Sequence, residues 1–164
     1  MKPNPMMSGW ASHLPALAAC VAHTNGPVLE LGAGAYSTPM LHALCAKREL
    51  LTIESNIEWL AEFGMFDRGN HRLVLSDKID SAMGQAWDVV LVDSAPGGSR
   101  VRFMESLRGQ VRLFVVHDTQ PGPVCYHYDR ILPSFPYRVE STWHPTRTTV
   151  VSDSDNLEWL AGLI

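Results

Sequence analysis

The apolar residues of this chain fall into short runs, and longer segments with helical spacing separate them. Short apolar runs are typical of buried strands, whereas an apolar residue every three or four positions indicates a helix with one buried face. The run at 87–93 is almost unbroken, as in a parallel strand covered on both faces. This pattern predicts strands at 27–31, 49–54, 71–75, 87–93 and 111–116, and helices at 12–24, 39–47, 57–65, 99–108 and 124–132.

The last part of the chain departs from this alternation. Residues 137–143 and 146–151 are both rich in residues that favour strands, and only His144 and Pro145 separate them. A link of two residues is too short for a crossover helix, so the two runs are predicted to pair as antiparallel strands. Beyond Asp153 we expect a short helix that packs back onto the domain or contacts a partner chain.

Two glycines mark a tight turn after the first strand. Gly32 and Gly34 follow the strand directly, and Ser37 or Thr38 can cap the helix that begins after them. Pro39 suits the first turn of that helix, where a missing backbone N–H costs little. A strand, a glycine turn and a helix N-terminus together form a pocket in which the backbone approaches a ligand closely.

Composition restricts the class of protein. With 46% hydrophobic and 18% charged residues, the chain is predicted to form one soluble domain over residues 1–164. The net charge of −4 argues against a nucleic-acid partner, which would require a basic surface. No apolar run is long enough to cross a membrane, and the N-terminus has no signal-like core. The three cysteines lack metal-ligand spacing, so a reducing, cytoplasmic location is expected.

Acidic residues close several of the predicted strands. Glu54, Asp77 and Asp93 each stand at or just after the end of a strand, and His117 and Asp118 follow the fifth one. In a doubly wound sheet, ligands bind outside the carboxyl ends of the strands. These side chains are therefore expected to meet at one site.

Two kinds of nucleotide cofactor fit this arrangement. Glu54 lies 20 residues after Gly34, where a carboxylate can accept from the ribose hydroxyls of a dinucleotide or of S-adenosylmethionine. The dinucleotide fingerprint has a third glycine three residues after the second, and Ser37 occupies that position. The antiparallel hairpin is also an unusual ending for a dinucleotide-binding sheet, which favours S-adenosylmethionine.

The pattern Glu30-x-Gly32-x-Gly34-x-x-Ser37-Thr38, followed by acids at later strand ends and a closing hairpin, resembles the class I S-adenosylmethionine-dependent methyltransferases. The resemblance covers roughly residues 10–152. It implies an α/β, doubly wound, Rossmann-like sheet of seven strands in the order 3-2-1-4-5-7-6, with strand 7 antiparallel and helices on both faces. It also implies S-adenosylmethionine as the cofactor.

The resemblance implies a role for each matching residue. Glu30 is expected near the methionine ammonium, Glu54 at the ribose hydroxyls, Asp77 at the adenine and Asp93 beside the methyl group. Tyr36 replaces a small residue of many relatives and is expected to shape the methionine pocket. The implied cofactor-binding residues are Glu30, Gly32, Ala33, Gly34, Tyr36, Ser37, Glu54, Ser55, Asp77, Lys78 and Asp93.

Asp93 and Asp118 are the predicted metal-binding pair. They are expected to end neighbouring strands, about 4.8 Å apart, where two carboxylates can share a divalent cation such as Mg²⁺ or Mn²⁺. The pair resembles that of the catechol-type O-methyltransferases, although Pro96 stands in place of their lysine and Thr119 in place of their asparagine.

A second local likeness concerns the acceptor. The segments 92–98 and 116–118 are similar to the Asp-x-Pro-x-Gly and Val-His-Asp signatures of plant glucuronoxylan 4-O-methyltransferases, which methylate sugar hydroxyls. Transfer to a hydroxyl needs alignment and the removal of a proton, for which a carboxylate or a bound metal is suited.

We therefore predict a methyltransferase that acts on a small-molecule or sugar acceptor, most readily at oxygen. Its predicted catalytic residues are Asp93, Asp118 and His117, and its predicted substrate contacts are Arg100, His144 and Arg147. His13 is expected to be structural or solvated. Two alternatives stay open: a non-catalytic binding module with the same fold, and another transfer reaction such as aminopropyl transfer. A second subunit, in a homodimer, is one way to complete the acceptor pocket.

Overall fold

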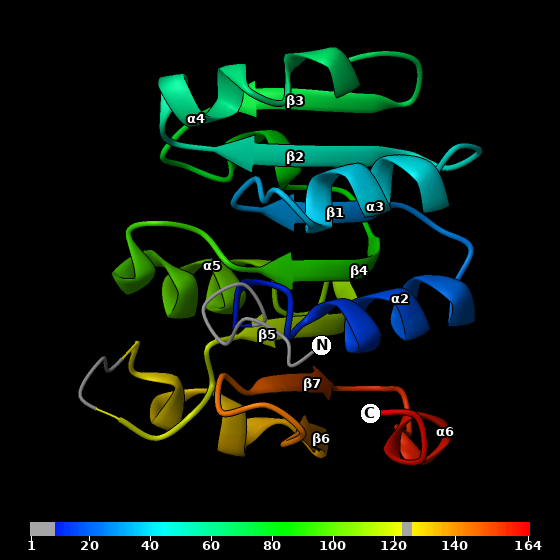
Figure 1. The fold of residues 1–164 in the computed structure, drawn as a ribbon. Helices are drawn as coiled ribbons and strands as arrows, with labels where there is room; N and C mark the ends of the chain where they lie inside the picture. Colours follow the sequence, from blue (N-terminus) through cyan, green and yellow to red (C-terminus); the bar gives the residue numbers. More distant parts are fainter. Residues whose placement is uncertain (1–8, 123–125) are drawn as a thin grey trace, which may run out of the picture.

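Five parallel strands and a C-terminal antiparallel hairpin form one sheet (Figure 1). The structure is a computed structural model that describes residues 9–122 and 126–164. The strand order β3-β2-β1-β4-β5-β7-β6, with β7 antiparallel to both of its neighbours, confirms the predicted topology. The strands are β1 (Val28–Leu31), β2 (Leu50–Glu54), β3 (His71–Leu75), β4 (Trp87–Val92), β5 (Val111–His117), β6 (Tyr137–Ser141) and β7 (Thr148–Ser152).

Strand β1 lies at the centre of the sheet, between β2 and β4. Leu29 pairs with Leu51 on one side and with Val90 on the other, and all three side chains are buried. The chain moves outward from β1 in one direction through β2 and β3, and in the other through β4 and β5. The carboxyl ends of β1 and β4 are thus the switch point at which sheets of this kind bind ligands.

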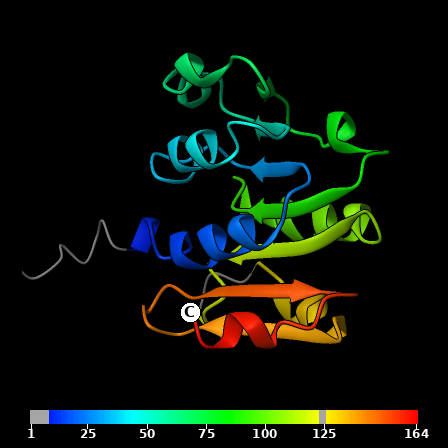
Figure 2. The ribbon, with the colours of Figure 1, turned by 90° about the vertical axis from the view of Figure 1, so that its right-hand side faces the viewer.

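Helices cover both faces of the sheet. Helices α2 (Leu14–His23) and α3 (Ser37–Leu44) lie on one face, whereas α5 (Arg100–Leu107) lies on the other (Figures 1 and 2). Each face of the sheet has its own hydrophobic core, and successive residues of a strand pack into opposite cores. Val89 packs in the core that contains α2, and Val90 packs in the core that contains α5. The order of strands and helices positions one open edge, the carboxyl edge, for ligand binding.

The C-terminal segment packs back onto the domain. Helix α6 (Glu158–Ala161) begins after Leu157, and Leu157 and Leu160 are buried in the same core cluster as α2. The Trp159 ring stacks on that of His23 at 3.8 Å between centroids. Of the two expected positions for this helix, the structure therefore shows packing within the chain.

Three helix predictions were wrong in extent. The helix predicted over 39–47 is α3, which begins at Ser37, so Ser37 and Thr38 lie inside it and Tyr36 stands at its N-cap. The helix predicted over 57–65 ends early, as α4 (Ile57–Ala61) followed by the 3-10 turn η1 (Gly64–Phe66), because Gly64 disfavours a continuous helix. The helix predicted over 124–132 is replaced, over the described residues from 126 on, by the 3-10 turns η4 (Tyr128–Arg130) and η5 (Leu132–Ser134). Residues 124 and 125 lie outside the described residues.

Local conformation explains the third difference. His127 adopts a left-handed backbone conformation with φ 61°, which interrupts a right-handed helix. Pro133 cannot donate a backbone hydrogen bond and also disfavours helical geometry in the residue before it. Two further 3-10 turns, η2 (Asp80–Ala82) and η3 (Gly97–Ser99), stand in connections for which no helix was predicted. Within residues 9–122 and 126–164, no helix is long and apolar enough to span a bilayer.

Arg48 joins the end of α2 to the segment that enters β1. Its guanidinium donates to the carbonyl oxygens of Val21, Thr24 and Gly26 at 2.6–2.9 Å, and to the Thr24 hydroxyl at 3.0 Å. These bonds satisfy carbonyl groups beyond the last helical turn and fix the position at which β1 begins.

Replacing Arg48 with methionine keeps the apolar stem and removes all of these bonds. We expect Arg48→Met to lower the free energy of unfolding by about 2 kcal/mol, because hydrogen bonds from a charged donor are worth more than neutral ones. Urea denaturation measures this change. Arg130→Met, at an exposed position of η4, is the matched control; an equal loss in both variants would contradict the role of Arg48.

Candidate functional site

The turn after β1 passes very close to the end of β4. Gly32 has a φ of +95°, and a Cβ at this position would lie 2.6 Å from the carbonyl oxygen of Asp93. A side chain is thus excluded by both backbone conformation and space. The sequence accordingly places glycine where two strand ends must approach each other, at the switch point of the sheet.

Beneath this turn lies the carboxylate of Glu30, which is completely buried. Its Oε2 accepts from the hydroxyls of Thr38 at 2.9 Å and Thr52 at 2.7 Å. Thr38 in turn accepts from the backbone N–H of Gly34 at 2.9 Å. Glu30 therefore supports the turn from below, and the structure places it behind the wall of the cavity described below rather than on that wall.

The hydrogen bonds to Glu30 continue to the edge of the sheet. Thr52 donates to Glu30, so it accepts from Nε2 of His71, which lies 2.9 Å away. Nδ1 of His71 then accepts from Nδ1 of His42, at 3.0 Å. In this series of hydrogen bonds, each donor is directed toward Glu30. The series therefore stabilises the ionised form of Glu30.

Burial acts in the opposite direction and dominates. It raises the pKa of Glu30 to about 7 from its usual 4.5, although hydrogen bonds from Ser37, Thr52 and Thr38 lower it in part. Burial also lowers the pKa of His71 to about 4, so this imidazole is neutral at pH 7 and can hold the donor direction described above.

Glu54 closes β2 next to the glycine turn. Its Oε2 accepts from the N–H of Ala33 at 3.0 Å, and its Oε1 accepts from the N–H groups of Ser55 and Asn56 at 2.7 and 2.9 Å. The Ser55 hydroxyl donates to the carbonyl oxygen of Ala95 at 2.8 Å, beyond the end of β4. Glu54 thus fixes the loops around the end of β1, and it also lines both of the cavities that open there.

The smaller of these cavities lies toward β3 and holds about 220 Å³. Asp77 lines it, together with apolar side chains of Ile53 and Phe103. Lys78 is exposed, and the cavity wall does not include it. The recess combines apolar side chains with two carboxylates, those of Asp77 and Glu54.

The larger cavity, of about 640 Å³, opens over β1, β4 and β5. It brings together predicted cofactor and catalytic residues that are far apart in the sequence. Glu54 and Ala95 border both cavities, so the two lie side by side along the carboxyl edge of the sheet. Its lining is Gly9, Trp10, His13, Ala33, Gly34, Ala35, Tyr36, Ser37, Glu54, Asn56, Trp59, Asp93, Ala95, His117, Asp118 and Thr146.

Arg100 lies between the two aspartates that were predicted to share a metal ion. Its Nη2 contacts Oδ1 of Asp93 at 2.9 Å and its Nη1 contacts Oδ2 of Asp118 at 3.1 Å. Its Nε donates to the carbonyl oxygen of Ser94 at 2.8 Å, and the side chain is 6% exposed. The guanidinium therefore occupies the position predicted for a shared cation, and it is buried instead of facing an acceptor as predicted.

Further contacts hold this arrangement. The Tyr128 hydroxyl donates to the carbonyl oxygen of His117 at 3.1 Å and lies 3.4 Å from Arg100 Nη1. Asp118 has a left-handed backbone conformation with φ 59°, which aspartate adopts more readily than most residues. Burial opposes the charge of Arg100, but Tyr128 and the two aspartates outweigh it, so the pKa of Arg100 lies above its usual value.

His117, the last residue of β5, is held on both sides. Its Nδ1 lies 3.1 Å from Oδ1 of Asp93, and its Nε2 lies 2.9 Å from the Ser12 hydroxyl. Burial opposes the ionisation of both partners, but the attraction between them prevails: the pKa of His117 is raised and the pKa of Asp93 is lowered. Asp93, Asp118 and His117, the predicted catalytic residues, do lie together on one wall of the cavity.

The predicted substrate contacts in the hairpin are arranged differently. The Arg147 side chain forms an ion pair with Glu140 at 2.7 Å, and the cavity lining does not include it. Nδ1 of His144 accepts from the N–H of Thr146 at 3.0 Å. Of this turn, it is Thr146 that reaches the cavity.

Sequence reasoning missed several residues of the site, among them Trp10, His13, Trp59 and Tyr128. Trp59 donates its indole N–H to the carbonyl oxygen of Ala33 at 2.7 Å and so covers the glycine turn. Trp10 and His13 line the cavity from the start of α2, although their spacing indicated only a helix packed on the sheet. The exposure of Trp10, at 69%, is seen only in the structure.

Comparison with solved structures identifies the fold. The N-methyltransferase NodS from Bradyrhizobium japonicum WM9 is similar, with a TM-score of 0.65 and 11% identity over 94% of this chain and 100% of that one. The N-terminal domain of human METTL16, solved with S-adenosylhomocysteine, has a TM-score of 0.61 and 12% identity over 90% of this chain and 71% of that one. A candidate caffeoyl-CoA O-methyltransferase from Staphylococcus aureus has a TM-score of 0.61 and 12% identity over 86% of this chain and 81% of that one.

The chain thus has the fold of the class I S-adenosylmethionine-dependent methyltransferases, as its sequence motif predicted. At these sequence identities the likeness establishes the fold alone. By their names, NodS methylates nitrogen and the Staphylococcus aureus protein methylates oxygen. No protein-family model and no curated protein sequence matches the chain.

The raised pKa of Glu30 predicts a characteristic dependence of stability on pH. Between pH 4.5 and 7 the folded protein keeps a proton on Glu30 that the unfolded chain releases. The contribution of Glu30 to stability therefore falls as the pH rises through this window and is level above it. The total change is about 3 kcal/mol.

Urea denaturation of the wild-type protein and of Glu30→Gln, at pH 5 and pH 8, measures this contribution. We expect the variant to gain stability relative to the wild-type protein as the pH rises, because glutamine does not ionise. A difference between the two proteins that is independent of pH would show that Glu30 has an ordinary pKa in the folded state.

Proposed function

We propose that this protein is an S-adenosylmethionine-dependent methyltransferase that acts on a hydroxyl group of a small molecule or sugar. The observation that carries the proposal is the pair of adjoining cavities along the carboxyl edge, with the Gly32 turn and Glu54 between them. In this proposal the smaller cavity holds the nucleobase, and the larger one holds the amino-acid part together with an acceptor. A fold shared with methyltransferases supports the same cofactor.

The proposed orientation of the cofactor follows the chemistry of the lining. The adenine enters the smaller recess at Asp77, and Glu54 accepts hydrogen bonds from the ribose hydroxyls. The methionine part lies on the glycine turn next to Tyr36 and Ser37. Glu30 acts indirectly in this proposal, by holding Thr38 and the turn in place. The sulfonium methyl group then points toward Asp93.

An oxygen acceptor is favoured by the groups that face this methyl position. Asp93, Asp118 and His13 line the cavity, and each can accept a proton from a hydroxyl. In the transfer, the acceptor oxygen forms a bond to the methyl carbon as the methyl–sulfur bond breaks. The sulfonium becomes a neutral thioether, and the hydroxyl proton passes to one of these bases. Trp10, Tyr36 and Trp59 provide aromatic faces on which a sugar or aromatic ring can stack.

Calorimetric titration with S-adenosylhomocysteine tests the cofactor directly. We expect the wild-type protein to bind it in the micromolar range, and Glu54→Gln to bind it at least about tenfold more weakly, since hydrogen bonds to a charged acceptor are lost. Asp88→Asn, at the opposite end of β4 and outside both cavities, is the matched control and should bind normally.

Two results would decide against the proposal. Absence of both heat and thermal stabilisation with S-adenosylhomocysteine would exclude this cofactor. Normal binding without methyl transfer from labelled S-adenosylmethionine to any of a panel of phenols, catechols and uronic-acid glycosides would favour a non-catalytic binding module.

A further inference from the structure

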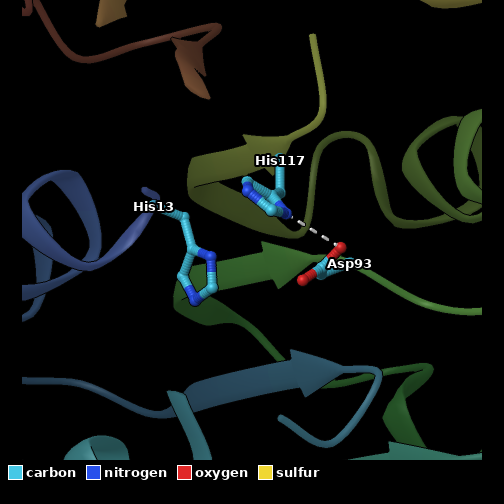
Figure 3. Close-up of side chains that lie close together, drawn as sticks. All are labelled: His13, Asp93 and His117. Atoms are coloured by element: carbon cyan, nitrogen blue, oxygen red, sulfur yellow. Dashed lines mark ion pairs between the residues drawn. The ribbon is translucent and has the colours of Figure 1, made fainter. Parts of the chain in front are cut away.

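Three side chains from distant parts of the chain converge at the wall of the larger cavity. His13 precedes α2, Asp93 follows β4, and His117 ends β5 (Figure 3). One potential ligand atom from each lies within 4.8 Å of the others. All three residues line the cavity, so a ligand held between them would be accessible from it.

His13 has no structural role that explains its polar atoms. It is 2% exposed, and neither ring nitrogen has a hydrogen-bond partner among the described residues. Leaving a buried polar group unsatisfied costs about 1–3 kcal/mol. Its ring lies against that of His117, at 4.6 Å between centroids and 71° between planes.

The tautomer of His117 is set from outside the cluster. The Ser12 hydroxyl donates to the carbonyl oxygen of Gly9 at 3.0 Å, so it accepts from Nε2 of His117. A proton on Nε2 leaves Nδ1 with a lone pair in the neutral ring. A histidine that binds metal through one nitrogen commonly donates from the other in this way, which fixes the orientation of the ring.

The contact between His117 and Asp93 does not have the geometry of a hydrogen bond. Nδ1 is 3.1 Å from Oδ1 of Asp93, yet this nitrogen has no hydrogen-bond partner among the described residues. Two ligands that are each about 2.1 Å from one ion lie about 3.0–3.4 Å apart at octahedral or tetrahedral angles. The separation of this ion pair also falls within the range for two ligands of a common ion.

We propose that His13, Asp93 and His117 form a binding site for a divalent transition-metal ion of the zinc type. Two imidazoles and one carboxylate are a typical donor set for zinc and for related ions, whereas magnesium prefers oxygen ligands. This site differs from the predicted Asp93–Asp118 pair, because the guanidinium of Arg100 occupies the space between those carboxylates.

Arg100 and Asp118 complete the charge balance of the site. Asp93 and Asp118 carry two negative charges and Arg100 one positive charge, so the cluster with neutral histidines retains one negative charge. A divalent cation is attracted to this negative charge. The hydrogen bond from Arg100 orients the Asp93 carboxylate in the manner of an outer-shell partner.

Three protein ligands leave a coordination position that faces the cavity. Such an open position distinguishes catalytic from structural zinc sites. If the proposed methyl transfer is correct, a hydroxyl of the acceptor bound there would lose its proton more easily. The metal site itself rests on the side-chain geometry and can be tested without cofactor or acceptor.

Cobalt and zinc titrations of tag-free, chelator-treated protein provide the test. We expect one Co²⁺ per chain, detected by its visible absorption bands, and displacement of Co²⁺ by Zn²⁺. His13→Ala and His117→Ala should each weaken binding by more than the roughly tenfold to hundredfold that loss of an outer-shell partner costs. His23→Ala, at an exposed histidine of α2, is the matched control and should bind as the wild-type protein does.

The proposal fails if Zn²⁺ binds only at millimolar concentrations, or if His13→Ala and His23→Ala bind equally well. Circular dichroism of each variant excludes unfolding as the cause of a loss. Protein that binds S-adenosylhomocysteine but no metal would overturn this inference and leave the proposed cofactor intact. Metal binding without S-adenosylhomocysteine binding would support the metal site and overturn the proposed cofactor.

Discussion

The buried carboxylate of Glu30 is the constraint on which the site depends. It lies under the glycine turn after β1, and it connects that turn to β2 through Thr52 and to α3 through Thr38. A buried polar group is tolerated when it is hydrogen-bonded, and the donors that reach Glu30 extend to His71 and His42 at the edge of the sheet. The position of the glycine turn is therefore set by the sheet itself.

A buried charge organises the other half of the site. The guanidinium of Arg100 joins the ends of β4 and β5 by contacting Asp93, Asp118 and the carbonyl oxygen of Ser94. Neighbouring carboxylates repel each other, and the guanidinium offsets this repulsion while its planar shape holds them apart. The same arrangement turns Asp93 toward His117 and His13, where the proposed metal and methyl group would meet.

The sequence predicted the sheet well because the evidence for it is local. Each strand is a short apolar run, and the two-residue link at His144 and Pro145 required an antiparallel hairpin. The residues at the strand ends were predicted to meet, and the structure brings Glu54, Asp93 and His117 to one cavity. Their place along the sheet edge follows from strand order alone.

The missed features depend on packing between distant segments. His13 reaches His117 only because α2 packs across β4 and β5, and its helical spacing gave no indication of a ligand. Arg100 was expected to face an acceptor, since it begins a helix after a glycine-rich loop. The segment 94–99 instead folds back, so that the side chain points under the site. The pattern of residues along the sequence does not predict such a change in the direction of a side chain.

The central claim is that one ligand with a nucleoside and an amino-acid part lies along the carboxyl edge of the sheet. A crystal structure of the protein with S-adenosylhomocysteine tests it most directly. The account predicts adenine beside Asp77, ribose hydroxyls at Glu54, and the sulfur atom on the side of Asp93 and His117. A ligand bound outside these two cavities, or one with its sulfur directed away from Asp93, would contradict it.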